Sequence, residues 1–181
     1  EYSVATYKDN DASFPAPKLP TDWDEIDLSA DAERLDDDVQ LAVEQLVEPW
    51  TTGSNGTVEV VCVEGDAGDA IGAFGVRRAR IAELDARTAM AWIAWAGASG
   101  GAHGRRRGAA SGRFGAWWLL GALGDFADEW PVNPDALGQF ANELRWYRWD
   151  AYEPVMGWSL QLVIEDAEEE VAWAINARDA S

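Results

Sequence analysis

The chain has 181 residues, of which 33 are acidic and 14 basic, so its net charge is −19, and 48% of its residues are hydrophobic. These values are typical of one domain with a substantial core, and no apolar run reaches the ~18 residues that a membrane-spanning helix needs. The negative charge argues against nucleic acid and anionic membranes as partners, because their phosphate groups would repel the chain.

The rest of the composition indicates which metal sites, disulfides and partners are possible for this chain. The single cysteine, Cys62, excludes an internal disulfide and a multi-cysteine metal site, and we expect a cytoplasmic protein without a metal. The acidic residues either keep the protein soluble or, as in a DNA mimic, form a carboxylate surface that binds a basic partner. The chain also contains eleven tryptophans. Because tryptophan and arginine are favoured at interface centres, this surplus predicts a homodimer or another homo-oligomer.

The first part of the chain predicts an extended arm and then a long helix. Residues 1–22 contain three of the seven prolines and little periodicity, so we assign them to an arm that precedes a single domain over 23–181. Ser29 is a candidate N-cap, and the apolar spacing after it predicts an amphipathic helix of about 20 residues that ends at Pro49. Its acidic run, 36–38, fits a solvated face better than a metal site, because neighbouring helical residues point in different directions.

The middle of the chain predicts three strands. Residues 57–64 are mostly β-branched and predict a strand, and 65–72 form a Gly/Asp turn region. Residues 74–84 and 88–96 predict two more strands, although the sequence VRRARIAEL within the first is also compatible with a helix. The second of them is apolar on both faces, which is typical of a central strand.

A helix is predicted next, over 105–123, and three of its glycines, at 108, 112 and 115, share one face. That face can approach another backbone or a ligand closely. After a loop, Asn133 is expected to cap a short helix with Pro134 at its first position, running through Leu144.

The last 37 residues predict a three-stranded antiparallel meander, because 145–150, 157–166 and 171–177 alternate apolar and polar residues. In the first of these strands, arginines and aromatic residues lie on both faces. They could line a ligand pocket or a subunit contact, or place an arginine against a tryptophan at a sheet edge. Together the elements predict an α+β domain with a mostly antiparallel sheet and about three main helices.

Positive charge is concentrated in residues 76–113, which hold eight of the 14 basic residues and only two acidic ones. Three consecutive arginines would lie in the first turn of the predicted helix, where the helix dipole disfavours cations. Positive charge at that place indicates an anion that offsets it, and the backbone N–H groups of a helix N-terminus are a common anion site. We therefore predict an anion-binding turn within 97–113 of a binding or interaction protein, formed by Arg105, Arg106, Arg107, Gly108, Ala110 and Arg113.

Two sources of that anion remain open. Carboxylates of the acidic N-terminal helix, in the same chain or in a partner subunit, could pair with the arginines, which would then be internal counter-ions. Alternatively, the anion is a phosphate, carboxylate or nucleotide ligand. His103, beside the arginines, is the weak candidate for a catalytic base, although a lone loop histidine is more often structural.

The sequence Arg105-Arg106-Arg107-Gly108-Ala109-Ala110 also satisfies the pattern Arg/Gln-x-x-Gly-x-Gly/Ala. Locally it resembles the acyl-CoA-binding motif of the GNAT family of N-acetyltransferases, where the motif lies between a central strand and a helix. The resemblance covers residues 57–124. It implies an acyl-CoA-dependent enzyme in which the backbone of this turn cradles the pyrophosphate of a CoA-type cofactor. The chain departs from the family pattern after the helix, where we predict a loop and a second helix instead of a strand.

Overall fold

The computed structural model describes residues 16–29, 31–126, 129–154 and 157–180. Seven strands form one antiparallel sheet in the order β1-β4-β5-β6-β7-β3-β2, and six helices lie in the described ranges. In chain order the elements are β1 (Asp24–Ile26), β2 (Arg34–Leu35), α1 (Val39–Leu46), α2 (Glu48–Thr52), β3 (Thr57–Glu64), α3 (Ala67–Gly72), β4 (Ala79–Leu84), α4 (Ala86–Ala98), α5 (Ala109–Leu123), α6 (Pro134–Glu143), β5 (Arg145–Asp150), β6 (Trp158–Asp166) and β7 (Val171–Asp179).

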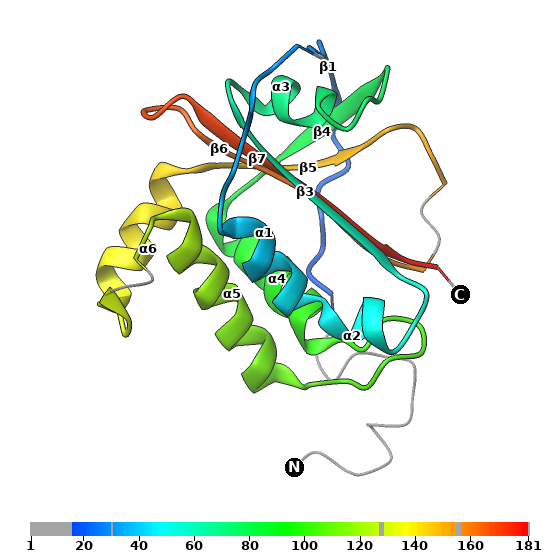
Figure 1. The fold of residues 1–181 in the computed structure, drawn as a ribbon, viewed down its shortest axis with the longest axis vertical. Helices are drawn as coiled ribbons and strands as arrows, with labels where there is room; N and C mark the ends of the chain where they lie inside the picture. Colours follow the sequence, from blue (N-terminus) through cyan, green and yellow to red (C-terminus); the bar gives the residue numbers. More distant parts are fainter. Residues whose placement is uncertain (1–15, 30, 127–128, 155–156, 181) are drawn as a thin grey trace.

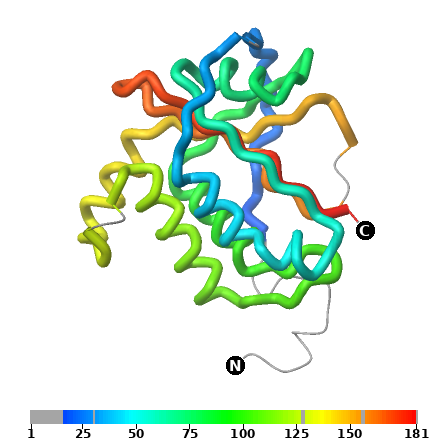
Figure 2. Tube along the Cα trace, in the orientation of Figure 1, coloured from blue at the N-terminus to red at the C-terminus, as the bar shows by residue number. Residues whose placement is uncertain are grey.

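The centre of the sheet joins distant parts of the chain. The last strand, β7, pairs along its length with β3, from Thr57 opposite Arg178 to Glu64 opposite Val171. Figure 2 shows the two strands side by side through the middle of the molecule. On its other side β7 pairs with β6, and β6 pairs with β5, which confirms the predicted C-terminal meander.

The two faces of the sheet carry two apolar clusters of different size. Leu160, Leu162 and Ile164 of β6 point to the larger cluster, which they share with α1, α4, α5 and α6. Val163, on the opposite face, belongs to a smaller cluster with α3. Figure 1 shows α3 on one side of the sheet and the other helices on the opposite side. Both faces are therefore covered, and the predicted α+β class with a mostly antiparallel sheet is confirmed.

Two single elements also agree with their predictions. The strand predicted over 57–64 is β3. The short helix after the loop is α6, with Pro134 in its first turn and the Asn133 side chain accepting a hydrogen bond from the Asp135 backbone N–H at 2.8 Å. In both places the signal was local: β-branched residues in the strand, and a cap followed by proline in the helix.

The predicted long N-terminal helix is wrong in its extent. Residues 34–35 pair with β3 as the short strand β2, and α1 begins only at Val39, after the acidic run. Pro49 does not end the helix but lies in the first turn of a separate helix, α2. Proline is tolerated there because a first-turn N–H has no acceptor within the helix.

The Gly/Asp region 65–72 was predicted as a turn, but it contains the helix α3. Asp66 is its N-cap and accepts hydrogen bonds from the backbone N–H groups of Gly68 and Asp69, at 2.7 and 3.1 Å. The Asp69 side chain accepts one in return from the Asp66 N–H at 3.0 Å. This capping box stabilises a turn of helix in a sequence whose glycines disfavour one.

The strand predicted over 88–96 is also wrong, because these residues belong to α4. Asp85 caps this helix by accepting a hydrogen bond from the Thr88 N–H at 2.6 Å. The run is apolar all round because α4 lies between the sheet and α5, so periodicity alone could not separate it from a central strand. The preceding strand is shorter than predicted, since β4 begins at Ala79.

The helix predicted over 105–123 begins later, at Ala109. The three arginines therefore precede the helix, in the loop that leads from α4. Of the predicted arm over 1–22, residues 1–15 lie outside the described residues, and 16–22 form neither helix nor strand. No helix in the described ranges is long and apolar enough to cross a membrane.

Candidate functional site

A cleft of about 940 Å³ lies between α1 and α2 on one side and the start of α5 on the other. The arginine loop forms one end of it and two aromatic side chains of α5 form the other. The residues that line the cleft are Ala42, Gln45, Leu46, Glu48, Pro49, Thr52, Gly53, Arg105, Arg106, Arg107, Ala110, Ser111, Phe114, Gly115 and Trp118. Its volume is within the range of small-molecule sites in proteins.

Buried polar contacts hold the loop between α4 and α5 in place. Ser99, fully buried after α4, accepts a hydrogen bond from the Trp50 indole N–H at 2.8 Å. Asp179, fully buried at the end of β7, accepts one from the Ala102 N–H at 2.6 Å. At Gly104 a side chain would overlap the carbonyl oxygen of Pro49, so the loop lies directly on α2. These contacts hold the loop in position, and the arginines that follow Gly104 therefore lie at the cleft.

Arg107 is bound to the opposite wall. Its guanidinium donates a hydrogen bond to the Gln45 carbonyl oxygen at 2.7 Å and forms an ion pair with Glu48. Gln45 lies in the last turn of α1, where the carbonyl oxygens receive no hydrogen bond from a backbone N–H of the helix itself. This arginine therefore joins the loop before α5 to α1 and α2, as the counter-ion interpretation predicts for it. Among the described residues, Arg105 forms no such ion pair.

The N-terminus of α5 opens on the same cleft. Gly108 is its N-cap, with φ of +83°, and no side chain caps the helix or places a carboxylate in its first turn. The next residues, Ala110 and Ser111, line the cleft. Their backbone N–H groups come before the first N–H that bonds within the helix, that of Gly112 to the Gly108 carbonyl oxygen, so they are donors without an acceptor in the helix. A negatively charged group at this point would be stabilised by both the donors and the helix dipole.

A family model described as a family of unknown function, DUF6183, matches residues 1–181. The chain belongs to DUF6183. No curated protein and no solved structure matches it.

In this DUF6183 chain the structure brings together four of the predicted anion-site residues. Arg105, Arg106, Arg107 and Ala110 line the cleft. Gly108 is adjacent, at the N-cap, whereas Arg113 is exposed and is not among the lining residues. His103 is likewise exposed and lies outside the lining.

The sequence interpretation missed the aromatic end of the cleft. Phe114 and Trp118 follow Ala110 at intervals of four residues, and this spacing places all three on one face of α5. The spacing was visible in the sequence. The sequence did not reveal that this face lines a cleft. The opposite wall comes from α1 and α2, which lie some 60 residues earlier in the chain.

The resemblance to the GNAT acyltransferases does not extend to the structure of the DUF6183 chain. That motif requires a central strand before the turn, and here the turn follows α4, which is a helix. The local pattern of arginine and glycine is the same, but its backbone context differs. The cleft is therefore interpreted from its own residues.

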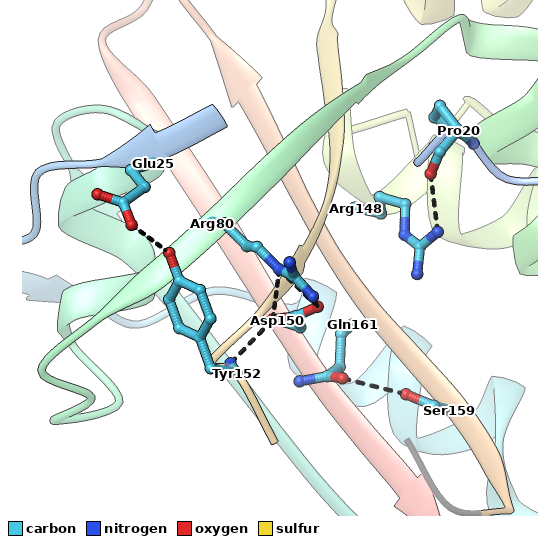
Figure 3. A network of polar contacts seen from close by, with 8 residues as sticks. All are labelled: Pro20, Glu25, Arg80, Arg148, Asp150, Tyr152, Ser159 and Gln161. Atoms are coloured by element: carbon cyan, nitrogen blue, oxygen red, sulfur yellow. Dashed lines mark hydrogen bonds and ion pairs between the residues drawn. The ribbon is translucent and has the colours of Figure 1, made fainter. Parts of the chain in front are cut away.

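A second group of polar side chains lies around Asp150, the last residue of β5 (Figure 3). Asp150 is buried and accepts two hydrogen bonds from the Arg80 Nε and Nη2 atoms, at 3.0 Å each. It also accepts one from the Tyr152 N–H at 2.8 Å. The Tyr152 hydroxyl donates to Glu25 at 2.8 Å, which raises the pKa of Tyr152 and lowers that of Glu25.

The same group fastens the N-terminal part of the described chain to the sheet. Arg80 and Arg148 both lie over the ring of Trp23, with guanidinium carbons 4.5 and 4.4 Å from its centroid. Arg148 also donates a hydrogen bond to the Pro20 carbonyl oxygen at 2.8 Å (Figure 3). This is the arginine-on-tryptophan arrangement that was one alternative for the Arg/aromatic strand. These contacts bind one part of the chain to another, and we assign them a structural role.

Cys62 is buried, as its position in the middle of a strand suggests. Its thiol lies 3.7 Å from the carboxylate of Asp37 and is directed to it as a donor. Burial, reinforced by the negative charge of Asp37, raises the pKa of Cys62 to about 12. A thiol that holds its proton so firmly is not a nucleophile at neutral pH.

Proposed function

We propose that this chain is a binding protein for an anionic small molecule of the phosphate type, held in the cleft between α1, α2 and α5. The observation that carries the proposal is that Arg105, Arg106 and the open N-terminus of α5 line one cleft. Each of these features favours an anion, and they come from adjacent positions of the chain.

The charge balance of the cleft supports the proposal. Three of its lining residues are arginines and one, Glu48, is acidic, in a chain whose net charge is −19. Because Glu48 pairs with Arg107, its charge is offset within the wall. Arg105 forms none of the ion pairs among the described residues, so it adds positive charge to the loop end of the cleft, and such charge attracts anions from solution.

The geometry also suits a group with several oxygens. Backbone N–H groups at a helix start and planar guanidinium groups both donate to phosphate, and an arginine can do so with two parallel hydrogen bonds. Arg107 serves this arrangement indirectly, since it holds the two walls together.

The test is calorimetric titration of the protein with inorganic phosphate and pyrophosphate at low ionic strength, on wild type and on the double variant Arg105→Ala/Arg106→Ala. Hydrogen bonds to charged groups contribute about 1.5–3 kcal/mol each. Loss of both arginines should therefore weaken binding by at least about tenfold, since 1.4 kcal/mol corresponds to a factor of ten.

Arg113→Ala is the matched control, because Arg113 lies on the same helix and is exposed but does not line the cleft. This variant should bind as wild type does. Equal losses in both variants would indicate a non-specific charge effect and contradict the proposal. Absence of binding in wild type, with a lower melting temperature in the double variant, would instead favour internal counter-ions in an acidic interaction module.

A further inference from the structure

The aromatic end of the cleft is arranged as an open stacking surface. The rings of Phe114 and Trp118 lie nearly parallel, with an interplanar angle of 9° and centroids 6.5 Å apart. Trp130 meets both rings edge-on, at centroid distances of 6.0 and 5.5 Å. Phe114 is nonetheless 58% exposed. The rings are therefore oriented by their neighbours while an aromatic surface stays accessible from the cleft.

The two ends of the cleft are a short distance apart along α5. A helix rises about 1.5 Å per residue, so Phe114 lies about 6 Å and Trp118 about 12 Å beyond Ala110 along its axis. Between them, Gly115 lacks a side chain, and the Leu46 side chain of α1 lies over it. Ala42 and Leu46 of α1, each only 2% exposed, line the opposite wall. An inorganic anion would occupy the arginine end only.

Resting on the proposed function, we infer that the ligand is a phosphate ester that carries a flat aromatic ring system, that is, a nucleoside phosphate or an aryl phosphate. Its phosphate lies at Arg105 and Arg106, and its ring stacks on Phe114 and Trp118. The spacing along α5 suits one such molecule, because phosphate and ring are joined by a short linker. Stacking on an aromatic side chain accepts any planar ring and needs no hydrogen-bonding pattern.

The experiment compares ligands that share the phosphate and differ in the ring. Calorimetric dissociation constants are measured for adenosine monophosphate, phenyl phosphate and ribose 5-phosphate, with wild type and with Phe114→Ala. Truncating a stacking aromatic residue weakens binding by roughly 5- to 150-fold in comparable sites. We expect adenosine monophosphate to bind at least about tenfold more tightly than ribose 5-phosphate. Phe114→Ala, which leaves Trp118 in place, should reduce this difference at least about fivefold without changing the affinity for ribose 5-phosphate.

Trp117→Ala is the control, because Trp117 is a neighbouring exposed aromatic residue of α5 that does not line the cleft. Phenyl phosphate distinguishes the two kinds of ligand. If it binds as tightly as adenosine monophosphate, the cleft accepts any phosphate ester with an aromatic ring. If only adenosine monophosphate binds tightly, the ligand is a nucleoside phosphate. Equal affinities for adenosine monophosphate and ribose 5-phosphate would overturn the inference but leave the anion site. Failure of all three ligands to bind would overturn both. An equal loss for all ligands in Phe114→Ala would also overturn the inference.

Discussion

At the scale of single residues, buried carboxylates hold distant segments together. Asp179 accepts hydrogen bonds from the Ser54 hydroxyl and the Ala102 N–H, so the last strand is bound both to the loop after α2 and to the loop after α4. Asp150 does the same for β4 and the turn after β5. Each is surrounded by donors, which is the condition under which a charge can be buried.

Cys62 gives a prediction at this scale. Its pKa is raised to about 12 from an ordinary 9.0, so at pH 8 the native protein should react with iodoacetamide about three orders of magnitude more slowly than the unfolded chain does. The measurement is the rate of alkylation by mass spectrometry, in buffer and in guanidinium chloride. Similar rates in the two conditions would contradict the assignment.

The same shift links Cys62 to stability. Because the unfolded chain releases the thiol proton first, the neutral thiol favours the folded state fully below pH 9 and progressively less up to about pH 12. A Cys62→Ala variant should lack this part of the alkaline decline in the free energy of unfolding.

At the scale of elements, glycine is required for different reasons at the N-cap of α5 and within that helix. At Gly112 a side chain would overlap the carbonyl oxygen of Ala94, so this glycine allows α4 and α5 to pack closely. At Gly108 a side chain would meet nothing within 4 Å, and the residue is needed for its φ of +83°. Of the glycines that the sequence predicted on one helix face, Gly112 thus serves backbone packing, whereas Gly108 precedes the helix and provides the backbone conformation of its N-cap.

Alanine substitution should have opposite effects at a helical glycine that is closely packed and at one that is open to solvent. Gly112→Ala should lower the free energy of unfolding by about 1–3 kcal/mol, as overpacking does. Gly138→Ala, in α6, should raise it by about 0.5–1 kcal/mol, because nothing lies near the added methyl group and alanine favours the helix. Urea denaturation of both variants checks this, and a Gly112→Ala protein as stable as wild type would refute the packing assignment.

Elements were predictable where their signals were local and complete. The alternation in β6 and β7 and the Asn133 cap before α6 depend on neighbouring residues only. The helix α4 was not predictable, because its burial on all sides arises from contacts with the sheet and α5. At the candidate site the arginines were found by charge alone, whereas Phe114 and Trp118 required knowledge of the wall across from them.

At the scale of the whole molecule, charge affects both the stability of the fold and the binding of anions. A net charge of −19 repels itself, and salt screens that repulsion over about 10 Å at 0.1 M. Raising NaCl from about 10 to 300 mM should therefore raise the melting temperature of the unliganded protein while weakening phosphate binding. Calorimetry at the two salt concentrations measures both, and a melting temperature that falls with salt would contradict this account of the acidic surface.

The homodimer stays a prediction, and the order of the sheet indicates where its contact would form. The two outermost strands are β1, with three residues, and β2, with two. Because β2 pairs only with Cys62 and Val63, the outer edge of β3 from Thr57 to Val61 has no strand partner among the described residues. Another chain can add a strand to such an edge, and on the helical surface Leu41 and Trp117 are exposed. A second copy that covered the free edge of β3 would also protect the sheet from edge-to-edge growth into larger aggregates.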